Sequence, residues 1–88
     1  MKEKELERIM KALANRRRLA ILKYLKEEKE ANVGDIAEKI RLSFKATSKH
    51  LGILSSSGIV DRDQRSLQMF YRLSGDLPSA ARSVLSFL

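Results

Sequence analysis

Apolar positions in the first half of the chain repeat with the spacing of amphipathic helices. Between residues 3 and 14 they recur at i, i+3, i+4 and i+7, which predicts a helix with one apolar side. Asn15 suits the N-cap of a second helix over residues 16–28, because its side chain can accept hydrogen bonds from the first backbone N–H groups. Residues 30–32 break the pattern, and residues 33–40 predict a third, short helix.

A fourth helix follows after a tight turn. Ser43 is a good N-cap for it, since its hydroxyl can accept from a backbone N–H group in the first turn. Thr47, Leu51 and Leu54 recur at helical spacing and predict its buried stripe. Gly58 suits the left-handed conformation that follows many helices, so we expect this helix to end just before it.

The period then changes to that of β-strands. Apolar and polar residues alternate from Leu67 to Leu73, which predicts a hairpin of two strands, roughly 59–63 and 67–73. The turn contains neither Gly nor Asn, so its type stays open. Asp76 and Pro78 begin a last helix that we expect to run over residues 76–88.

This order of elements predicts a fold. A short helix, a tight turn and a capped second helix form a helix-turn-helix, and the hairpin after it is a wing. The 88 residues are enough for one domain, 1–88. We therefore expect a mainly α chain with a small β-hairpin, a winged helix-turn-helix of order α-α-α-α-β-β-α, in which residues 3–14 and 76–88 serve dimerisation.

Charge adds a candidate partner. The net charge is +7 at pH 7, and no Asp or Glu occurs between Lys39 and Val60. Lys45 and Lys49 share one helix face, where like charges cost a few tenths of a kcal/mol, so an external anion such as DNA phosphate would turn their repulsion into attraction. A solvated lysine face is the alternative. The residues expected to lead this helix into a major groove are Ser43, Phe44, Lys45, Ala46, Ser48 and Lys49.

The two terminal helices carry more apolar residues than a small core needs. On a single chain the excess would form an exposed apolar patch, which a homodimer would bury. The alternative is that the two ends pack on each other within one chain. The candidate interface residues are Leu6, Ile9, Met10, Leu13, Leu77, Val84, Leu85, Phe87 and Leu88.

Four stretches, ALANRRRLAILKYL, VGDIAEKI, LSFKATSKHL and GIVDRDQRSLQMFYRL, resemble the ArsR-type winged helix-turn-helix repressors over nearly the whole chain. The resemblance implies a homodimer that binds a palindromic operator in double-stranded DNA and represses transcription. It implies DNA contacts for Ser43, Lys45, Ala46, Ser48 and Lys49 on the fourth helix, and it adds one further residue of that helix and three of the wing. These added residues are His50, Arg62, Gln64 and Arg65.

Three positions depart from the family pattern: Phe44 stands where glutamine is usual, Arg16 stands where a proline follows the cap, and the wing turn lacks its glycine. Phe44 lies on the flank of the buried stripe, so packing within the motif is the simpler expectation and contact with a thymine methyl the alternative. Arg62 and Arg65 bracket the wing tip, and we expect one of them to contact phosphate or the minor groove.

Several functions lack the side chains they need. With no Cys and a single His, the chain cannot assemble a transition-metal site, a thiol switch or a nucleophile–base pair, so we expect no metal, no cofactor and no enzyme activity. No apolar run approaches the roughly 20 residues that cross a bilayer, and no signal-peptide core is present, so we expect a cytoplasmic protein without membrane contact. The effector, if any, stays unknown. The alternative function is a winged helix for RNA or protein–protein contact.

Overall fold

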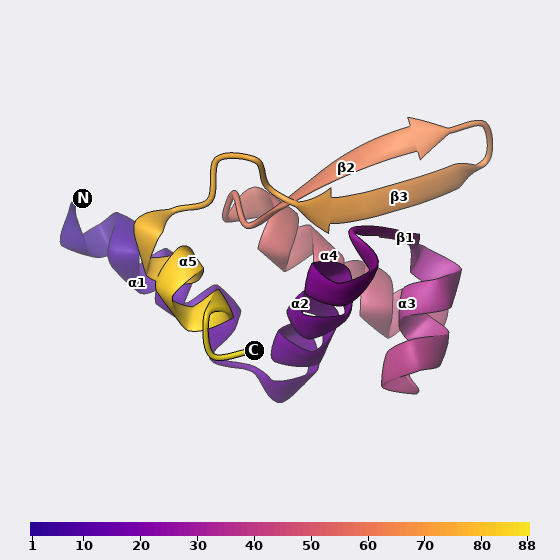
Figure 1. Cartoon of the computed structure of the whole chain (residues 1–88), viewed down its shortest axis with the longest axis horizontal. Coiled ribbons are helices and arrows are strands. Elements are labelled where there is room, and N and C mark those ends of the chain that lie inside the picture. Colours follow the sequence, from indigo (N-terminus) through magenta and orange to yellow (C-terminus); the bar gives the residue numbers. More distant parts are fainter.

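The computed structural model describes residues 1–88 and combines five helices with a three-stranded antiparallel sheet (Figure 1). Helices α1 and α5 pack together at one end of the molecule, and the β2–β3 hairpin extends from the other. The elements in chain order are α1 (Glu3–Leu13), α2 (Arg16–Glu28), β1 (Glu30–Asn32), α3 (Val33–Ile40), α4 (Phe44–Ser56), β2 (Val60–Arg65), β3 (Gln68–Leu73) and α5 (Ser79–Leu85). None of the helices has the length and apolarity needed to cross a membrane.

Side-chain caps fix where three of the helices begin. The Asn15 side chain accepts from the N–H groups of Arg17 and Arg18 at 2.9 and 3.1 Å, and Ser43 Oγ accepts from the Ala46 N–H at 3.1 Å. Both predicted N-caps are thereby confirmed. Asn32, which the sequence pattern did not single out, caps α3 in the same way.

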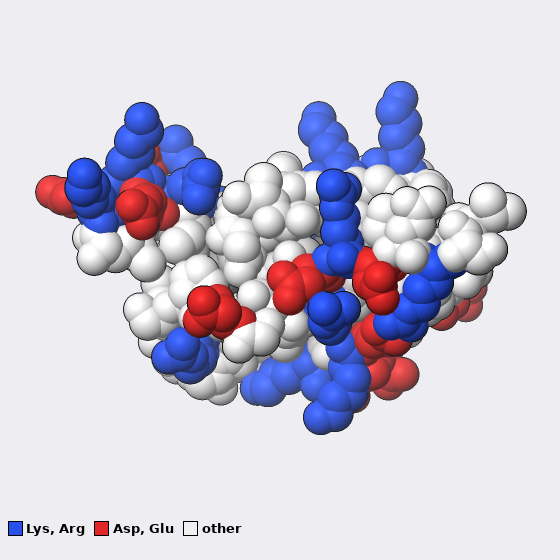
Figure 2. Space-filling view, turned by 90° about the horizontal axis from the view of Figure 1, so that it is seen from above, with Lys and Arg blue, Asp and Glu red and all other residues white.

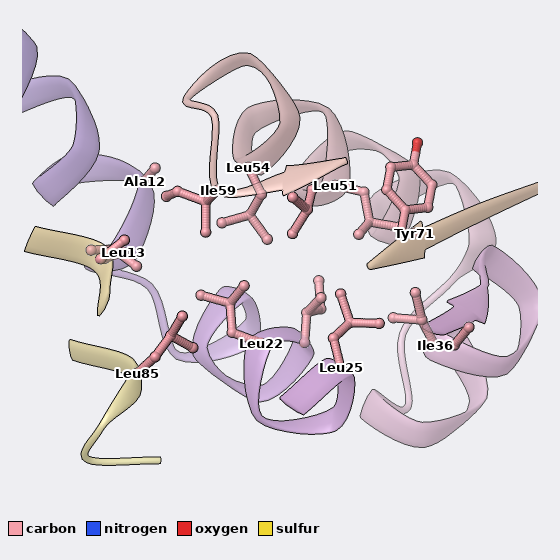
Figure 3. Close-up of a cluster of buried hydrophobic side chains, with 14 of the residues drawn as sticks. Ala12, Leu13, Leu22, Leu25, Ile36, Leu51, Leu54, Ile59, Tyr71 and Leu85 are labelled. Carbon is pink, nitrogen blue, oxygen red and sulfur yellow. The ribbon is translucent and has the colours of Figure 1, made fainter. Parts of the chain in front are cut away.

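The core lies between α2 and α4 (Figure 3). Leu22 and Leu25 of α2 point toward Leu51 and Leu54 of α4, and all four are at most 1% exposed. Thr47 is also fully buried, so the predicted stripe of α4 is confirmed. Burying a leucine side chain stabilises a fold by about 1.5–3 kcal/mol, so this contact determines how α4 sits on the rest of the chain.

The predicted hairpin is confirmed as β2 and β3, but the sequence pattern missed a third strand, because residues 30–32 form β1. This strand pairs antiparallel with β3, and the sheet order is β1-β3-β2. Three residues are too few to show the alternation of a strand, so only the pairing with β3 reveals β1. The hairpin is also longer than predicted, since β2 continues to Arg65 and leaves a two-residue loop at Ser66 and Leu67. Ser66 there has φ 57°, a left-handed conformation at the first loop position.

The last helix is shorter than the predicted range 76–88. It spans Ser79–Leu85, and Pro78 occupies its N-cap with an extended backbone of φ −54° and ψ 141°. A proline disfavours helical conformation in the residue before it, here Leu77, so the helix begins after Pro78 and not at Asp76. The first helix ends at Leu13, one residue before the predicted limit.

The Thr47 hydroxyl provides a test of the α4 packing. Thr47 Oγ1 is the one buried side-chain polar atom without a hydrogen-bond partner. Removing an unpaired buried hydroxyl while keeping the side-chain shape relieves its desolvation cost, so Thr47→Val should raise the free energy of unfolding by about 1 kcal/mol. Urea unfolding followed by circular dichroism measures this. Thr47→Ser, which keeps the hydroxyl and removes the methyl, should destabilise, and a destabilised valine variant would contradict the packing described.

Candidate nucleic-acid interface

The side of α4 opposite its buried stripe carries two exposed lysines, Lys45 and Lys49. Neither takes part in any of the three ion pairs of the chain. Helix α4 lies at the back of the molecule in Figure 1. Figure 2 is seen from above, so this back side forms its upper edge. In the middle and on the right of that edge, Lys and Arg side chains project without Asp or Glu beside them. The two positive charges are therefore uncompensated within the chain, which is the arrangement the sequence predicts.

Small residues lie between and beside these lysines. Ala46 and Ser48 are half-buried, and Ser43 is exposed at the N-cap. Gly52 is exposed, and a Cβ placed there would meet nothing within 4 Å. Apart from the two lysines, this face carries only small side chains, so a polyanion could approach the helix backbone closely.

Phe44 does not pack against the core, so the expectation of burial within the motif is wrong. Its side chain is 63% exposed, because it is the first residue of α4 and lies beyond the end of the stripe that begins at Thr47. The ring lines a shallow recess of about 230 Å³ together with Leu67 and Met69 of the wing. Leu67 itself is 97% exposed at the hairpin tip. An apolar rim thus joins the start of α4 to the wing.

Residues of the wing divide between two faces of the hairpin. Arg62 and Gln64 lie opposite Tyr71 and Met69 in the strand register. Because directly opposed residues of an antiparallel pair share a face, both lie on the face where Tyr71 is buried against the helices. Arg62 is exposed and forms no ion pair, so its charge is available on that side.

Arg65 lies on the opposite face and is already paired. Its Nη1 and Nη2 donate to the two carboxylate oxygens of Glu30 at 2.8 and 2.6 Å, and its Nε donates to Asp63 Oδ2 at 3.0 Å. The guanidinium also lies 4.6 Å from the centroid of the Phe70 ring. The hydrogen bond from Arg65 lowers the pKa of Glu30, as expected for a carboxylate held by a cation. Of the two wing arginines, the geometry thus leaves Arg62 as the free cation and ties Arg65 to β1.

His50 lies half-buried on α4 and contacts α2. Arg18 Nη1 donates to His50 Nδ1 at 3.1 Å. Burial, followed by the neighbouring charges of Arg18, Arg17 and Lys49, lowers the pKa of the imidazole below its ordinary value of 6.5. Arg17 in turn donates to the Ile40 carbonyl at 3.0 Å at the end of α3. Two arginines of α2 thereby hold the helix-turn-helix in place.

The candidate interface residues of the terminal helices separate into two groups. Ile9, Leu13 and Leu85 are 4–6% exposed, because α1 and α5 pack on each other within the chain; for these three the expectation of an exposed patch is wrong. The other six remain at least partly accessible. Leu6, Met10 and Phe87 are exposed, and Leu77, Val84 and Leu88 are half-buried.

The acidic side chains do not gather into a site. No group of three or more His, Asp or Glu side chains is placed to share a metal ion. The accessible surface described above instead combines a cationic face of α4, the unpaired Arg62 of the wing and the apolar rim.

These features define the class of the protein. Helix α3, the turn from Arg41 to Ser43 and α4 form a helix-turn-helix, and the β2–β3 hairpin stands beside it as a wing, so the chain is a winged helix-turn-helix domain. Residues 15–62 match the family of bacterial regulatory proteins named after arsR. The chain belongs to this ArsR family, which the resemblance of its motifs predicted.

Similar proteins agree with this assignment. The transcriptional activator HlyU of Vibrio cholerae is 39% identical over 66 residues, 75% of this chain and 60% of HlyU. The biofilm growth-associated repressor of Agrobacterium fabrum is 36% identical over 76 residues, 86% of this chain and 62% of the repressor. A homodimeric winged helix-turn-helix DNA-binding domain from Mycobacterium bovis superposes with a TM-score of 0.81 at 30% identity, covering 96% of this chain and 74% of that one.

The chain spans about three fifths of the length of these two curated relatives, from 60% to 62%. All three similar proteins are transcriptional regulators or DNA-binding domains, so the family is one of regulators and not of enzymes.

The two wing arginines should differ in their effect on DNA binding. Arg62→Ala should weaken binding and reduce the slope of log affinity against log salt by about 1 per bound chain, because one phosphate contact is lost. Arg65→Ala serves as the matched control and should leave that slope nearly unchanged, since two carboxylates already neutralise Arg65. Fluorescence anisotropy over a salt series measures both. A larger slope change for Arg65 would contradict the assignment of the two faces.

Proposed function

We propose that the chain is a sequence-specific transcriptional regulator that binds a palindromic operator as a homodimer and acts as a repressor without sensing metal. The observation that carries this proposal is the pair Lys45 and Lys49, exposed and unpaired on the one side of α4 that the core leaves free. A DNA phosphate near each ammonium would convert their mutual repulsion into two attractions and release counterions.

In this proposal α4 enters the major groove with its N-terminal end leading. Its first backbone N–H groups carry positive partial charge, which adds to the attraction for phosphate. Phe44 replaces polar readout by apolar contact with thymine methyl groups at the groove edge. Arg62 and Gln64 reach the backbone or minor groove from the wing. The proposed contact residues are Ser43, Phe44, Lys45, Ala46, Ser48, Lys49, His50, Arg62 and Gln64.

A second chain would pair along the outer sides of α1 and α5. The shallow apolar hollow beside α1, about 370 Å³, is lined by Leu6 and Met10 and rimmed by the charged side chains of Glu3, Glu7 and Lys11. Phe87 adds a ring that is 87% exposed. Apolar surface of this kind favours association, and the similar domain from Mycobacterium bovis is a homodimer. Two-fold symmetry would place the two copies of α4 on half-sites about 10 base pairs apart.

Repression needs only that the operator be occupied, whereas activation needs a further surface for the transcription machinery. The relative from Agrobacterium fabrum is a repressor and that from Vibrio cholerae an activator. We place this chain with the repressors, acting on double-stranded DNA in the cytoplasm.

Salt dependence tests the lysine face. The bound duplexes are first selected from a random pool, and affinity is then measured by anisotropy from low to physiological salt. Lys45→Ala combined with Lys49→Ala should weaken binding at low salt and reduce the salt slope by about 2 per bound chain, because two phosphate contacts are lost.

Phe44→Ala is the matched control on the same helix turn. It should weaken binding and relax the preference for thymine without changing the salt slope, since a phenyl ring carries no charge. A duplex RNA of the same sequence should compete poorly, because the major groove of A-form RNA is too deep and narrow for a helix. Unchanged binding by the double lysine variant would show that α4 is not the reading helix.

Dimerisation is tested by placing charge on the apolar side of α1. Leu6→Glu combined with Met10→Glu should give a monomer by light scattering and should protect one half-site instead of two in a footprint. Lys4→Glu with Arg8→Glu has the same spacing on the polar side of α1 and should leave the mass unchanged. A dimer that survives the first pair of changes would place the interface elsewhere.

A further inference from the structure

Arg18 is shared among three helices. From α2, its Nε and Nη2 donate to the carbonyls of Ala12 and Lys11 at the end of α1, at 2.5 and 3.0 Å, and its Nη1 donates to His50 Nδ1 on α4 at 3.1 Å. The guanidinium therefore satisfies orphan carbonyls of one helix terminus and contacts the side chain of another helix at the same time.

The contact with Arg18 fixes the protonation of His50. A guanidinium has five N–H donors, no acceptor, and is always charged in proteins. His50 Nδ1 must therefore accept, which requires a neutral imidazole with its proton on Nε2. Protonation of Nδ1 would remove the acceptor and place a second cation against Arg18.

The other ring nitrogen is left available. His50 Nε2 makes no hydrogen bond within the chain. Thr47 Oγ1 is the only side-chain polar atom that is both buried and without a partner. Because Nε2 has no partner either, it cannot be completely buried. His50 follows Lys49 and lies about 100° further around α4, on the flank between the lysine face and the buried stripe, where it is half-buried. One accessible N–H group thus lies on the flank of the helix whose lysine face is proposed to meet phosphate.

We propose that Arg18 is a positioning residue for DNA binding: it holds His50 in the neutral Nε2–H form, so that the imidazole donates one hydrogen bond to a DNA phosphate as an uncharged group. The inference rests on the proposed function and assigns a mode of contact within it. Its distinguishing feature is that this phosphate contact contributes affinity without contributing a charge.

The surroundings of the ring keep it neutral. The charged groups that act on it are cations from two elements, Arg17 and Arg18 of α2 and Lys49 of α4, and α1 contributes the two carbonyls that bind Arg18. Burial, and after it these cations, lower the pKa of His50, so the unfolded chain takes up the proton first as the pH falls. Stability linked to His50 is complete above about 6.5, the unfolded value, and is lost progressively below it.

The free protein tests the first half of the inference. Because His50 is the only histidine of the chain, long-range ¹H–¹⁵N correlation spectra report its tautomer and titration without overlap. At pH 7 the native protein should show the Nε2–H form alone, with a midpoint below 6.5. Arg18→Met should give a mixture of tautomers and a higher midpoint, and Arg18→Lys, which keeps a charged donor, should restore part of the native behaviour. A protonated ring or the Nδ1–H form in the native protein at pH 7 would overturn the inference.

Two substitutions of His50 test the second half without disturbing Arg18. The amide oxygen of His50→Asn can occupy the Nδ1 position and accept from Arg18, but nothing replaces the Nε2–H donor. The amide nitrogen of His50→Gln can occupy the Nε2 position instead. His50→Asn should lower operator affinity about tenfold, the worth of one hydrogen bond to a charged group, and His50→Gln should lower it less. Thermal unfolding should show that the asparagine variant folds as stably as the parent at pH 7.

The salt series separates the outcomes. Neither variant should change the salt slope, because a neutral imidazole releases no counterion. A slope reduced by about 1 in His50→Asn would show that His50 binds as a cation, and unchanged affinity would show that it makes no contact; either result overturns the inference. If the double lysine variant weakens binding while His50→Asn does not, this inference alone fails. If neither weakens binding, the proposed function of α4 fails with it.

Discussion

The burial of one side of α4 constrains everything else on the surface of this protein. Thr47, Leu51 and Leu54 are fully enclosed by the rest of the chain. Turning the helix to hide its lysines would expose two leucines, at a cost of about 1.5–3 kcal/mol each. The repulsion between Lys45 and Lys49 costs only a few tenths of a kcal/mol. The packing term is the larger, so the core keeps the lysines on the outside and leaves their repulsion for an external anion to relieve.

Local chemistry made most of the helices predictable. The N-caps Asn15 and Ser43 and the apolar stripe of α4 depend on neighbours within four residues, and all were confirmed. The strand β1 could not be found in this way, because three residues carry no period and the strand is defined by pairing with β3 some forty positions away. The start of α5 was predicted too early, because the effect of Pro78 on the residue before it outweighed the capping signal of Asp76.

The candidate site was predictable to the extent that it follows from helix geometry. The exposure of Lys45 and Lys49 follows from the period of α4, but the state of Arg65 does not, because its partner Glu30 lies 35 residues away in a strand that the pattern did not reveal. The burial of Phe44 and the exposure of Ile9, Leu13 and Leu85 were predicted wrongly for a related reason. A helical wheel shows which side of a helix a residue is on, but not where the core ends or which neighbouring helix covers that side.

The three-way arrangement at Arg18 has a mechanical consequence. One guanidinium binds carbonyls at the end of α1 and the imidazole on α4. A shift of either helix would therefore lengthen the hydrogen bonds that Arg18 makes to it or to the other helix. The positions of the end of α1 and of α4 are therefore linked through a single planar group. A rigid fork with several fixed donors performs this better than a flexible lysine would, since its hydrogen bonds cannot be made and broken one at a time without tilting the whole plane.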